Sequence, residues 1–441
     1  MTPSARIQAT LELLESIEAT PRPADAITSA YFRARRYIGS KDRADISTRL
    51  YAVLRHWARL GWWLEKQQAA QPPRARLLGW LALGEEMPLK AIGELCSGGK
   101  YAPAPLNDGE RDFLRKMQGA TIEHPDMPDD IKAECPADCA GALRKKFGKN
   151  FLREMRAMLA PATLDLRVNP LKSTREDMLA ELEKLGLKAE ACKLSPWGIR
   201  VFERANLSAL PMLKNGCVEI QDEGSQMVAT VVDARPGERV MDFCAGAGGK
   251  TLAIAATMKN KGRIIACDVM EGRLKRSVER FRRAGVYNVE TRVLKSERDP
   301  WIKKHKGGFD RVLCDAPCSG TGTWRRNPDA RWRPLGPGLE KLLHTQAEIL
   351  DSAARLVKAG GFLIYSTCSL LPSENEEQIE KFLAAHPDFT REDCGLDGAA
   401  YLSLTPAKHN TDGFFAAALK RQATSDKGSA KGKSKAAATE G

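Results

Sequence analysis

Short apolar strands alternate with helical stretches in the second half of this 441-residue chain, from about residue 216 to residue 419. The strand-like segments span residues 239–243, 263–268, 288–294, 311–315 and 362–366, and helical spacing lies between them, for example over 271–284 and 339–358. Strands separated in this way by helices form a parallel sheet with helices on both faces. Because ligands bind such sheets at the carboxyl ends of the strands, a site is expected in the loops that follow them.

The rest of the chain has a different periodicity. Apolar residues recur at helical spacing from Ile7 to Ile17 and again from Ile46 to Leu60, which predicts an all-helical domain. A strand, a helix and a strand then follow one another within about forty residues, and Ser173 with Glu176 has the spacing of a capping box at the start of that helix. The predicted parts are a helical domain over 1–143, a small α+β subdomain over 144–215, the α/β domain over 216–421, and a disordered basic tail over 422–441.

The net charge is +13, and only a small share of it lies in the last twenty residues. A positive field of this size favours a polyanion as partner, usually a nucleic acid, although charge that serves only solubility is an alternative. Arginines are dense between Arg33 and Arg55. They could follow a phosphate backbone, or they could form an ordinary solvated helix face.

The 11 cysteines are an odd number in a long chain whose first 15 residues lack the apolar core of a signal peptide, which favours reduced thiols over a disulfide framework. Two pairs have Cys-x-x-x-Cys spacing, but no His pair follows them, so no structural zinc or other metal is predicted. There is no apolar run of about 18 residues, which excludes a spanning helix. We expect a cytoplasmic protein without membrane association, and a monomer.

A glycine-rich loop follows the first strand of the α/β domain, where residues 242–251 are Asp-Phe-Cys-Ala-Gly-Ala-Gly-Gly-Lys-Thr. A nucleotide-binding P-loop would need glycine at Cys244, and a dinucleotide fingerprint would need glycine at Thr251, so each pattern fails at one position. The third class of ligand that uses such a loop is S-adenosylmethionine (SAM). The loop residues predicted to bind it are Cys244, Ala245, Gly246, Ala247, Gly248, Gly249 and Lys250.

An acidic residue ends the second strand at Asp268, 22 residues after Gly246. A carboxylate at this place can accept hydrogen bonds from ribose hydroxyls. Together with the glycine loop, Asp268 favours a ligand that contains adenosine.

Two further strands each end in a cysteine. Asp315-Ala-Pro-Cys318-Ser follows the fourth strand, and Ser366-Thr-Cys368-Ser follows the fifth. If the sheet is doubly wound, both thiols and the Asp315 carboxylate converge beside the cofactor.

This combination suits methyl transfer to carbon 5 of cytosine, which is a poor nucleophile. A thiolate that adds to carbon 6 makes carbon 5 electron-rich, so that it can take a methyl group. A proton must then leave carbon 5 before the thiol is expelled, so a second base is useful. A carboxylate at the polar edge of the base would stabilise the adduct. The nucleophile must be a thiolate, so a cation or a helix N-terminus nearby should lower its pKa. Ser373 and Glu376 have the spacing of a capping box just past Cys368, which predicts a helix start there.

These motifs resemble those of RNA 5-methylcytosine methyltransferases of the RsmB (Fmu/Sun) and NSUN group. Supporting matches lie at residues 166–169, 219–226, 325–329 and 411–415, and the resemblance covers roughly Leu164 to Leu419. It implies a Rossmann-like SAM-dependent fold with a seven-stranded sheet. By this resemblance Cys368 is the nucleophile, and Cys318 assists proton removal and product release. Asp315 would bind the cytosine edge and lie with Lys250 near the methionine end of SAM.

The sequence departs from the family's pattern at two places. The glycine loop has Ala-Gly where relatives usually have Ala-Pro, and small residues are kept there. The third strand is followed by Leu294-Lys295-Ser296, where relatives usually place an Asp towards the adenine. Ser296 or a backbone group would have to replace that Asp.

The helical N-terminal domain resembles the NusB-like domain of bacterial RsmB proteins, through residues 41–45 and 50–55. This favours 16S rRNA as the RNA partner over a tRNA. The loop from Trp324 to Arg333 holds four Arg and two Trp. Its arginines could pair with phosphates and its indoles could stack on an unpaired base, or the two Trp could pack inward.

Two rival functions of other classes remain. A P-loop NTPase would use Gly249-Lys250-Thr251 with Asp315 as its magnesium ligand, although Cys244 opposes this. A non-catalytic RNA-binding factor for ribosome assembly would bind RNA without needing Cys368.

Overall fold

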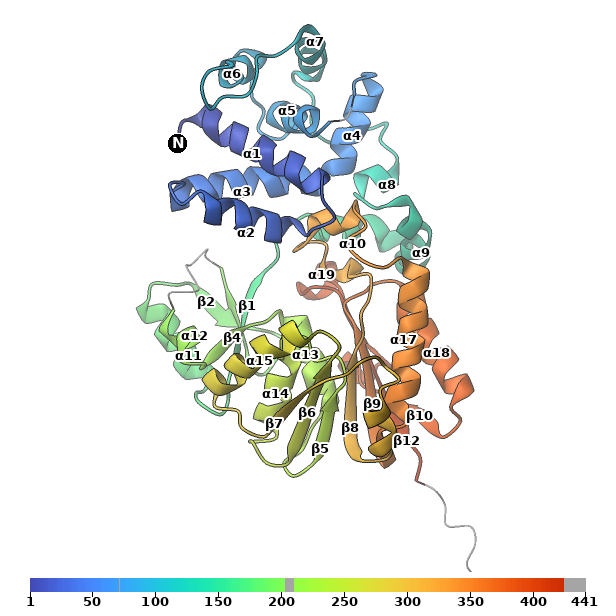
Figure 1. The fold of residues 1–441 in the computed structure, drawn as a ribbon. Helices are drawn as coiled ribbons and strands as arrows, with labels where there is room; N and C mark the ends of the chain where they lie inside the picture. Colours follow the sequence, from blue (N-terminus) through green and yellow to red (C-terminus); the bar gives the residue numbers. More distant parts are fainter. Residues whose placement is uncertain (71, 203–209, 424–441) are drawn as a thin grey trace, which may run out of the picture.

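The computed structural model describes residues 1–70, 72–202 and 210–423 (Figure 1). The predicted tail therefore lies outside the described residues, except for Gln422 and Ala423. Among the described helices, none is both long enough and apolar enough to cross a membrane.

The chain begins with a helical part. The predicted periodicity is confirmed, because Ile7, Leu14, Ile46 and Leu50 are all buried in one core. The helices are α1 (Pro3–Glu18), α2 (Ala24–Ala34), α3 (Ser40–Arg55), α4 (Trp57–Lys66), α5 (Pro73–Leu83), α6 (Leu89–Leu95), α7 (Asp108–Met117), α8 (Asp129–Lys132), α9 (Ala137–Phe147) and α10 (Phe151–Ala157).

Helix α9 runs through residue 143, where the first predicted division lies. Leu143 and Phe151, from α9 and α10, pack in one cluster with Trp324 and Leu370 of the α/β part. Helices α9 and α10 thus join the helical part to the α/β part. The domain boundaries after residues 143, 215 and 421 stay a prediction.

A small antiparallel sheet follows in the order β2-β3-β1-β4. Its elements are β1 (Leu164–Val168), α11 (Arg175–Lys184), β2 (Ala189–Ala191), β3 (Gly198–Val201), α12 (Pro211–Lys214) and β4 (Val218–Ile220). The predicted strand–helix–strand unit is confirmed, and β2 and β4 add to it. The predicted capping box is wrong by one residue, because the chain is still in a turn at Ser173, whose N–H donates to the carbonyl of Asn169. Thr174 and Asp177 form the capping box instead.

The α/β part contains a sheet in the order β10-β12-β9-β8-β5-β6-β7, with β11 paired to β12. Its strands are β5 (Arg239–Asp242), β6 (Arg263–Asp268), β7 (Val289–Val293), β8 (Phe309–Asp315), β9 (Val357–Thr367), β10 (Phe389–Glu392), β11 (Leu402–Leu404) and β12 (Phe414–Arg421). The strands from β9 to β7 are parallel, as predicted, and β12 is antiparallel to β9. The sheet is therefore mixed, and β11 is an eighth strand beyond the seven expected.

Helices cover both faces of this sheet (Figure 1). They are α13 (Glu223–Val232), α14 (Gly249–Thr257) and α15 (Glu271–Ala284) on one face, and α16 (Pro300–Lys304), α17 (Leu339–Ala354) and α18 (Glu376–Ala385) on the other. Successive strand residues point to opposite faces, so Val240 packs with the first set and Met241 with the second. The predicted helix over 339–358 ends at Ala354, because Val357 already pairs with Phe309 in the sheet.

The strand order reverses between β5 and β8. From β5 the chain continues outward to β6 and β7, and from β8 it continues to β9 on the other side. A crevice forms at the carboxyl ends of the strands where the order reverses, which is where ligands bind in such sheets. The glycine loop after β5 and the loop of Cys318 after β8 both open at this place.

Candidate active site

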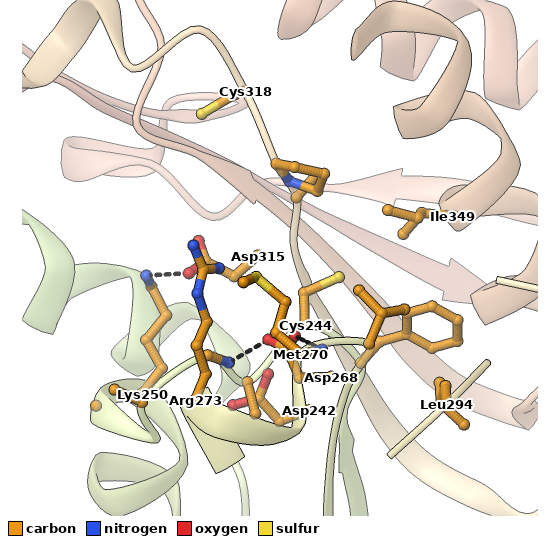
Figure 2. A pocket seen from close by; sticks show the side chains of 18 of the residues that line it. Asp242, Cys244, Lys250, Asp268, Met270, Arg273, Leu294, Asp315, Cys318 and Ile349 are labelled. Atoms are coloured by element: carbon orange, nitrogen blue, oxygen red, sulfur yellow. Dashed lines mark hydrogen bonds and ion pairs between the residues drawn. The ribbon is translucent and has the colours of Figure 1, made fainter. Parts of the chain in front are cut away.

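A cavity of about 640 Å³ opens at this reversal point, and Figure 2 shows many of its side chains. Among its lining residues are the predicted Cys244, Ala245, Gly246, Ala247, Gly249, Lys250, Asp268, Asp315, Cys318 and Cys368. The structure thus brings nearly the whole predicted set together. Gly248 is the exception, because it caps α14 behind the loop.

Gly248 fixes the shape of the glycine loop. Its backbone is left-handed, with φ +79°, and an added Cβ would lie 2.7 Å from the Phe281 ring and 2.8 Å from Ser277. Only glycine fits both the conformation and the space. Arginine side chains hold the loop from outside, since Arg280 donates to the carbonyl of Ala247 and Arg167 to that of Gly249.

Asp242 lies beneath the loop and is 1% exposed. One carboxylate oxygen accepts a hydrogen bond from Thr251, whereas Oδ1 is buried without a partner. Burial raises the pKa of Asp242 to about 7, against the lowering effect of the Thr251 hydroxyl. Asp242 therefore offers an unused acceptor to a polar group in the cavity.

Asp268 does not point an unused carboxylate at the ligand. Its two oxygens accept from the backbone N–H groups of Gly246 and Met270, at 2.9 and 2.7 Å. It thus ties the glycine loop to the start of α15. Its contact with a ribose, which the sequence predicts, stays a prediction.

Lys250 and Asp315 form an ion pair on one side of the cavity, with 2.6 Å between Nζ and Oδ2 (Figure 2). Burial disfavours the ammonium, but the charge and hydrogen bond of Asp315 outweigh it and raise the pKa of Lys250. The other carboxylate oxygen of Asp315 accepts from the Ser366 hydroxyl at 3.0 Å. Lys250 is therefore a fixed cation beside a held carboxylate.

The sulfur atoms of Cys318 and Cys368 lie 3.5 Å apart at the same cavity. Strand pairing places them together, because β8 and β9 are parallel neighbours with Asp315 opposite Ser366. The hydrogen bond to Cys368, together with burial, raises the pKa of Cys318 well above its usual range. Cys318 therefore stays protonated and can donate to a thiolate at Cys368. The convergence of the two thiols predicted from the strand ends is confirmed.

The helix after Cys368 begins differently from the prediction. Ser373 and Glu376 form no capping box, because residues 372–374 make a 3-10 turn and α18 starts after Asn375. Glu374 and Asn375 are fully buried beneath the two cysteine loops. Sequence reasoning missed both residues, although they follow Cys368 closely in the chain.

Leu294 and Ile349 lie at the side of the cavity away from Lys250 (Figure 2). Ser296 also lines the cavity, and its hydroxyl accepts from the N–H of Arg298. The N–H of Lys295 is already bonded to Asp299. At the departure from the family's pattern, Ser296 and the adjacent Glu297 thus keep polar groups at the cavity.

The sequence leaves two possibilities open for the loop after Cys318, contact with RNA or inward packing, and the structure shows inward packing for Trp324, Arg325 and Arg331. Trp324 is 2% exposed and packs against α9 and α10. Arg325 pairs with Asp412 and Asp222 in the interior, and Arg331 donates to the carbonyls of Glu134 and Met158. Arg325 thus satisfies buried carboxylates of the α/β part, and Arg331 satisfies backbone carbonyls of the helical part, so neither faces a ligand.

A basic cavity of about 420 Å³ lies on the helical part, lined by Ser29, Phe32, Arg33, Arg36 and Arg43. Other arginines nearby are engaged within the protein. Arg35 pairs with Glu12, and Arg49 pairs with Glu85. The sequence alone could not separate these two groups.

Within residues 1–70, 72–202 and 210–423, no group of three or more His, Cys, Asp or Glu side chains is arranged to hold a metal ion.

Comparison with known proteins relates the chain to one family. The family described as 16S rRNA methyltransferase RsmB/F matches residues 229–420, and the ferredoxin-like domain of RsmF/B-like methyltransferases matches residues 136–208. The probable ribosomal RNA small subunit methyltransferase B of Synechocystis is 37% identical over 270 residues, which cover 59% of this chain and 60% of that protein. The ribosomal RNA small subunit methyltransferase B of Salmonella paratyphi B is 28% identical over 92% of this chain and 96% of its own length.

Among solved structures, the crystal structure of PH0851 superimposes with a TM-score of 0.78 and 27% identity, over 96% of this chain and 99% of that one. This similarity extends through the helical part, the small sheet and the α/β part. It gives no support to the P-loop NTPase alternative. The chain belongs to the RsmB/F family of SAM-dependent methyltransferases.

Proposed function

We propose that this protein transfers a methyl group from SAM to carbon 5 of a cytosine in RNA, with 16S rRNA as the substrate, through a covalent adduct on Cys368. The observation that carries the proposal is the pair of thiols 3.5 Å apart, which line the same cavity as the glycine loop and the Lys250–Asp315 pair. A methyltransferase that methylates an oxygen or an amino nitrogen of RNA has no need of two such thiols, because these atoms can attack the methyl group directly.

SAM fits the residues that line the cavity. The glycine loop and the unpartnered Oδ1 of Asp242 would hold its polar groups, and the apolar Leu294 and Ile349 would flank the adenine with Ser296 beside it. Bound SAM supplies an electrophilic methyl group on a sulfonium.

Cys368 opens the reaction. Its thiolate forms a bond to carbon 6, and the electron pair of the C5–C6 double bond becomes nucleophilic at carbon 5, which takes the methyl group. Cys318 first stabilises the starting thiolate with a hydrogen bond. Once Cys368 is bonded to carbon 6 this hydrogen bond is lost, so Cys318 can give its proton to water and accept the carbon 5 proton as a thiolate. The electron pair of the broken C5–H bond then re-forms the double bond, the bond between carbon 6 and Sγ breaks, and Cys368 leaves as a thiolate.

Asp315 and Lys250 act on the polar edge of the base. The Asp315 carboxylate is 31% exposed and lines the cavity beside both cysteines, so a cytosine at Cys368 can reach it. Lys250 and Ser366 fix the carboxylate by holding one oxygen each. A held acceptor stabilises the adduct without reorganising during the reaction.

Two observations support 16S rRNA as the substrate. The helical part has a basic cavity, and several relatives are named as methyltransferases of small-subunit ribosomal RNA. Arg33, Arg36 and Arg43 gather around one basic cavity that could take the phosphates of a folded RNA. The target cytosine must be unpaired or flipped out to reach Cys368. A tRNA is the alternative substrate, and the RNA captured in the experiment below decides between them.

A trapping assay tests this function. Cys318→Ala protein is incubated with SAM and deproteinised total RNA, and then examined by denaturing electrophoresis for a protein–RNA adduct. We expect an adduct, because methylation proceeds while release stalls, and we expect none when Cys368 is also changed to Ala. Sequencing of the attached RNA identifies the substrate.

Two outcomes would contradict the proposal in different ways. Methyl transfer by Cys318→Ala protein without an adduct would overturn the division of labour between the thiols. No adduct and no transfer by wild-type protein, on free RNA and on ribosomal particles, would favour the non-catalytic assembly factor.

A further inference from the structure

Two buried neighbours in the chain, Glu374 and Asn375, contact the loops of both reactive cysteines. Each is 0% exposed. They belong to the segment between β9 and α18, which passes beneath the site. Neither side chain lines the cavity, so neither touches a substrate there.

Glu374 holds the loop of Cys318. Its Oε1 accepts from the N–H of Ser319 at 2.8 Å, and its Oε2 accepts from the Ser319 hydroxyl. Gln346 of α17 donates both to Oε1 of Glu374 and to the carbonyl of Pro317, each at 2.9 Å. The residues on either side of Cys318 are thus tied to one buried carboxylate and its amide partner.

Asn375 holds the loop of Cys368 in the same manner. Its Oδ1 accepts from the hydroxyl of Thr367, and its Nδ2 donates to the carbonyl of Ser369 at 2.9 Å. These two residues flank Cys368. A further contact joins the two loops, since the hydroxyls of Ser319 and Ser369 lie 3.2 Å apart.

We propose that Glu374 and Asn375 are a pair of positioning residues, Glu374 for Cys318 and Asn375 for Cys368, which together set the distance between the two thiols. Because the two residues are adjacent in the chain, the loops after β8 and β9 share one support. A buried, fully hydrogen-bonded support keeps a reacting group within the narrow range of positions that catalysis requires.

The proposal rests on the covalent mechanism proposed above and divides its steps between the two residues. Loosening of Asn375 displaces the nucleophile, so the adduct forms slowly. Loosening of Glu374 displaces Cys318, so the adduct forms but is released slowly. The Glu374 charge also contributes to the raised pKa of Cys318, after the Cys368 hydrogen bond and burial.

The test follows adduct formation and release by rapid quenching of full-length protein with SAM and the captured RNA. We expect Asn375→Ala to slow adduct formation by about 10- to 100-fold, and Glu374→Ala to slow release by a similar factor, so that adduct accumulates. Glu374→Gln should release the adduct at a rate within about 3-fold of wild type. The amide of the new side chain can accept from Ser319 and Gln346 and donate to the Ser319 hydroxyl.

Two matched controls separate positioning from loss of stability. Glu154 is a buried carboxylate that accepts from Thr405 and Ala407, and Asn169 is a buried amide that donates to Gly216 and Ala284. Glu154→Ala and Asn169→Ala lose comparable hydrogen bonds away from the cysteines. If their kinetic profiles match those of the Glu374 and Asn375 variants at equal folded fraction, the positioning role is wrong.

If the alanine variants do not fold, Ser319→Ala and Thr367→Val remove the same contacts one hydroxyl at a time. They should slow release and adduct formation respectively, and unchanged rates in both would overturn the proposal. Wild-type and Cys318→Ala proteins run in parallel, because no adduct and no methyl transfer in either would overturn the proposed function itself. Intact methyl transfer with unchanged rates in the positioning variants would overturn the positioning pair alone.

Discussion

The sulfur atoms of Cys318 and Cys368 lie 3.5 Å apart, although the two residues are 50 positions apart in the chain. Parallel pairing of β8 with β9 produces this proximity. The surroundings of the two thiols differ, since Lys250 is near Cys368 and Glu374 supports the loop of Cys318. Two chemically identical groups can therefore take different parts in one reaction.

Asp315→Asn should lower the rate of methyl transfer by on the order of 10²- to 10³-fold, because the charged acceptor that stabilises the adduct is lost. Single-turnover transfer of labelled methyl groups to RNA measures this rate. Glu348→Gln is the control, since it removes a carboxylate that pairs with the exposed side chains of Arg298 and His344. An Asp315→Asn enzyme as fast as this control would show that Asp315 has no role at the base.

The site could be predicted to a large extent from the sequence, because strand ends can be recognised and parallel strands bring their loops to one edge. The glycine loop, Asp315 and the two cysteines follow from that rule. The burial of Trp324 and Arg325 could not be predicted in this way. It depends on α9, α10 and Asp412, which lie far away in the chain and supply the apolar contacts and the countercharge.

The contacts of Asp268 and Glu374 could not be predicted either, because they also depend on residues that are distant in the chain. An acidic residue at a strand end can bind a ribose, hold backbone N–H groups, or do both, and only the folded structure shows the two backbone hydrogen bonds that Asp268 accepts. Glu374 appears in the sequence as one more acidic residue near a helix start. Its function depends on Ser319, which reaches it only after β8 and β9 have paired.

Asp242 makes stability depend on pH. Its pKa is about 7 in the folded protein and near 3.8 when unfolded, so the buried acid contributes stability below pH 4 that is lost as the pH rises through about 7. The asparagine side chain of the Asp242→Asn variant does not titrate and stays neutral. Its free energy of unfolding, relative to wild type, should therefore rise between pH 4 and pH 8, by up to roughly 4 kcal/mol.

Urea unfolding of SAM-free protein measures this difference. Glu134 has a pKa that burial also raises to about 7, but it titrates in both proteins and cancels in the comparison. A constant difference between the two proteins over this pH range would mean that Asp242 is ionised in the fold at all these pH values.

Arg325→Met should destabilise the fold by about 3 kcal/mol or more, because the side chains of Asp222 and Asp412 are 5% and 2% exposed and lose a buried partner. Thermal and urea unfolding measure the change. Arg298→Met breaks a pair whose arginine is 75% exposed, and it should cost less than about 1 kcal/mol. An Arg325→Met protein that keeps its stability but binds RNA weakly would restore the RNA-contacting role that the structure rejects.

Arg33, Arg36 and Arg43 line the basic cavity on the helical part and are expected to contact RNA phosphates. The triple alanine variant should bind RNA more weakly, and the slope of log affinity against log salt should fall by about 2, since each lost phosphate contact accounts for about 0.7 to 0.9. Filter binding or fluorescence anisotropy over a range of salt concentrations measures both quantities.

The matched control removes the same charge elsewhere, by alanine at the exposed Lys303, Lys304 and Lys306 at the end of α16. This variant should change the affinity only through the weak, long-range effect of net charge. Equal losses in the two triple variants would show that RNA responds to overall charge and does not bind in the cavity. Because Arg43 also donates to the carbonyl of Ile38, thermal unfolding must show that the arginine variant is folded before its affinity is interpreted.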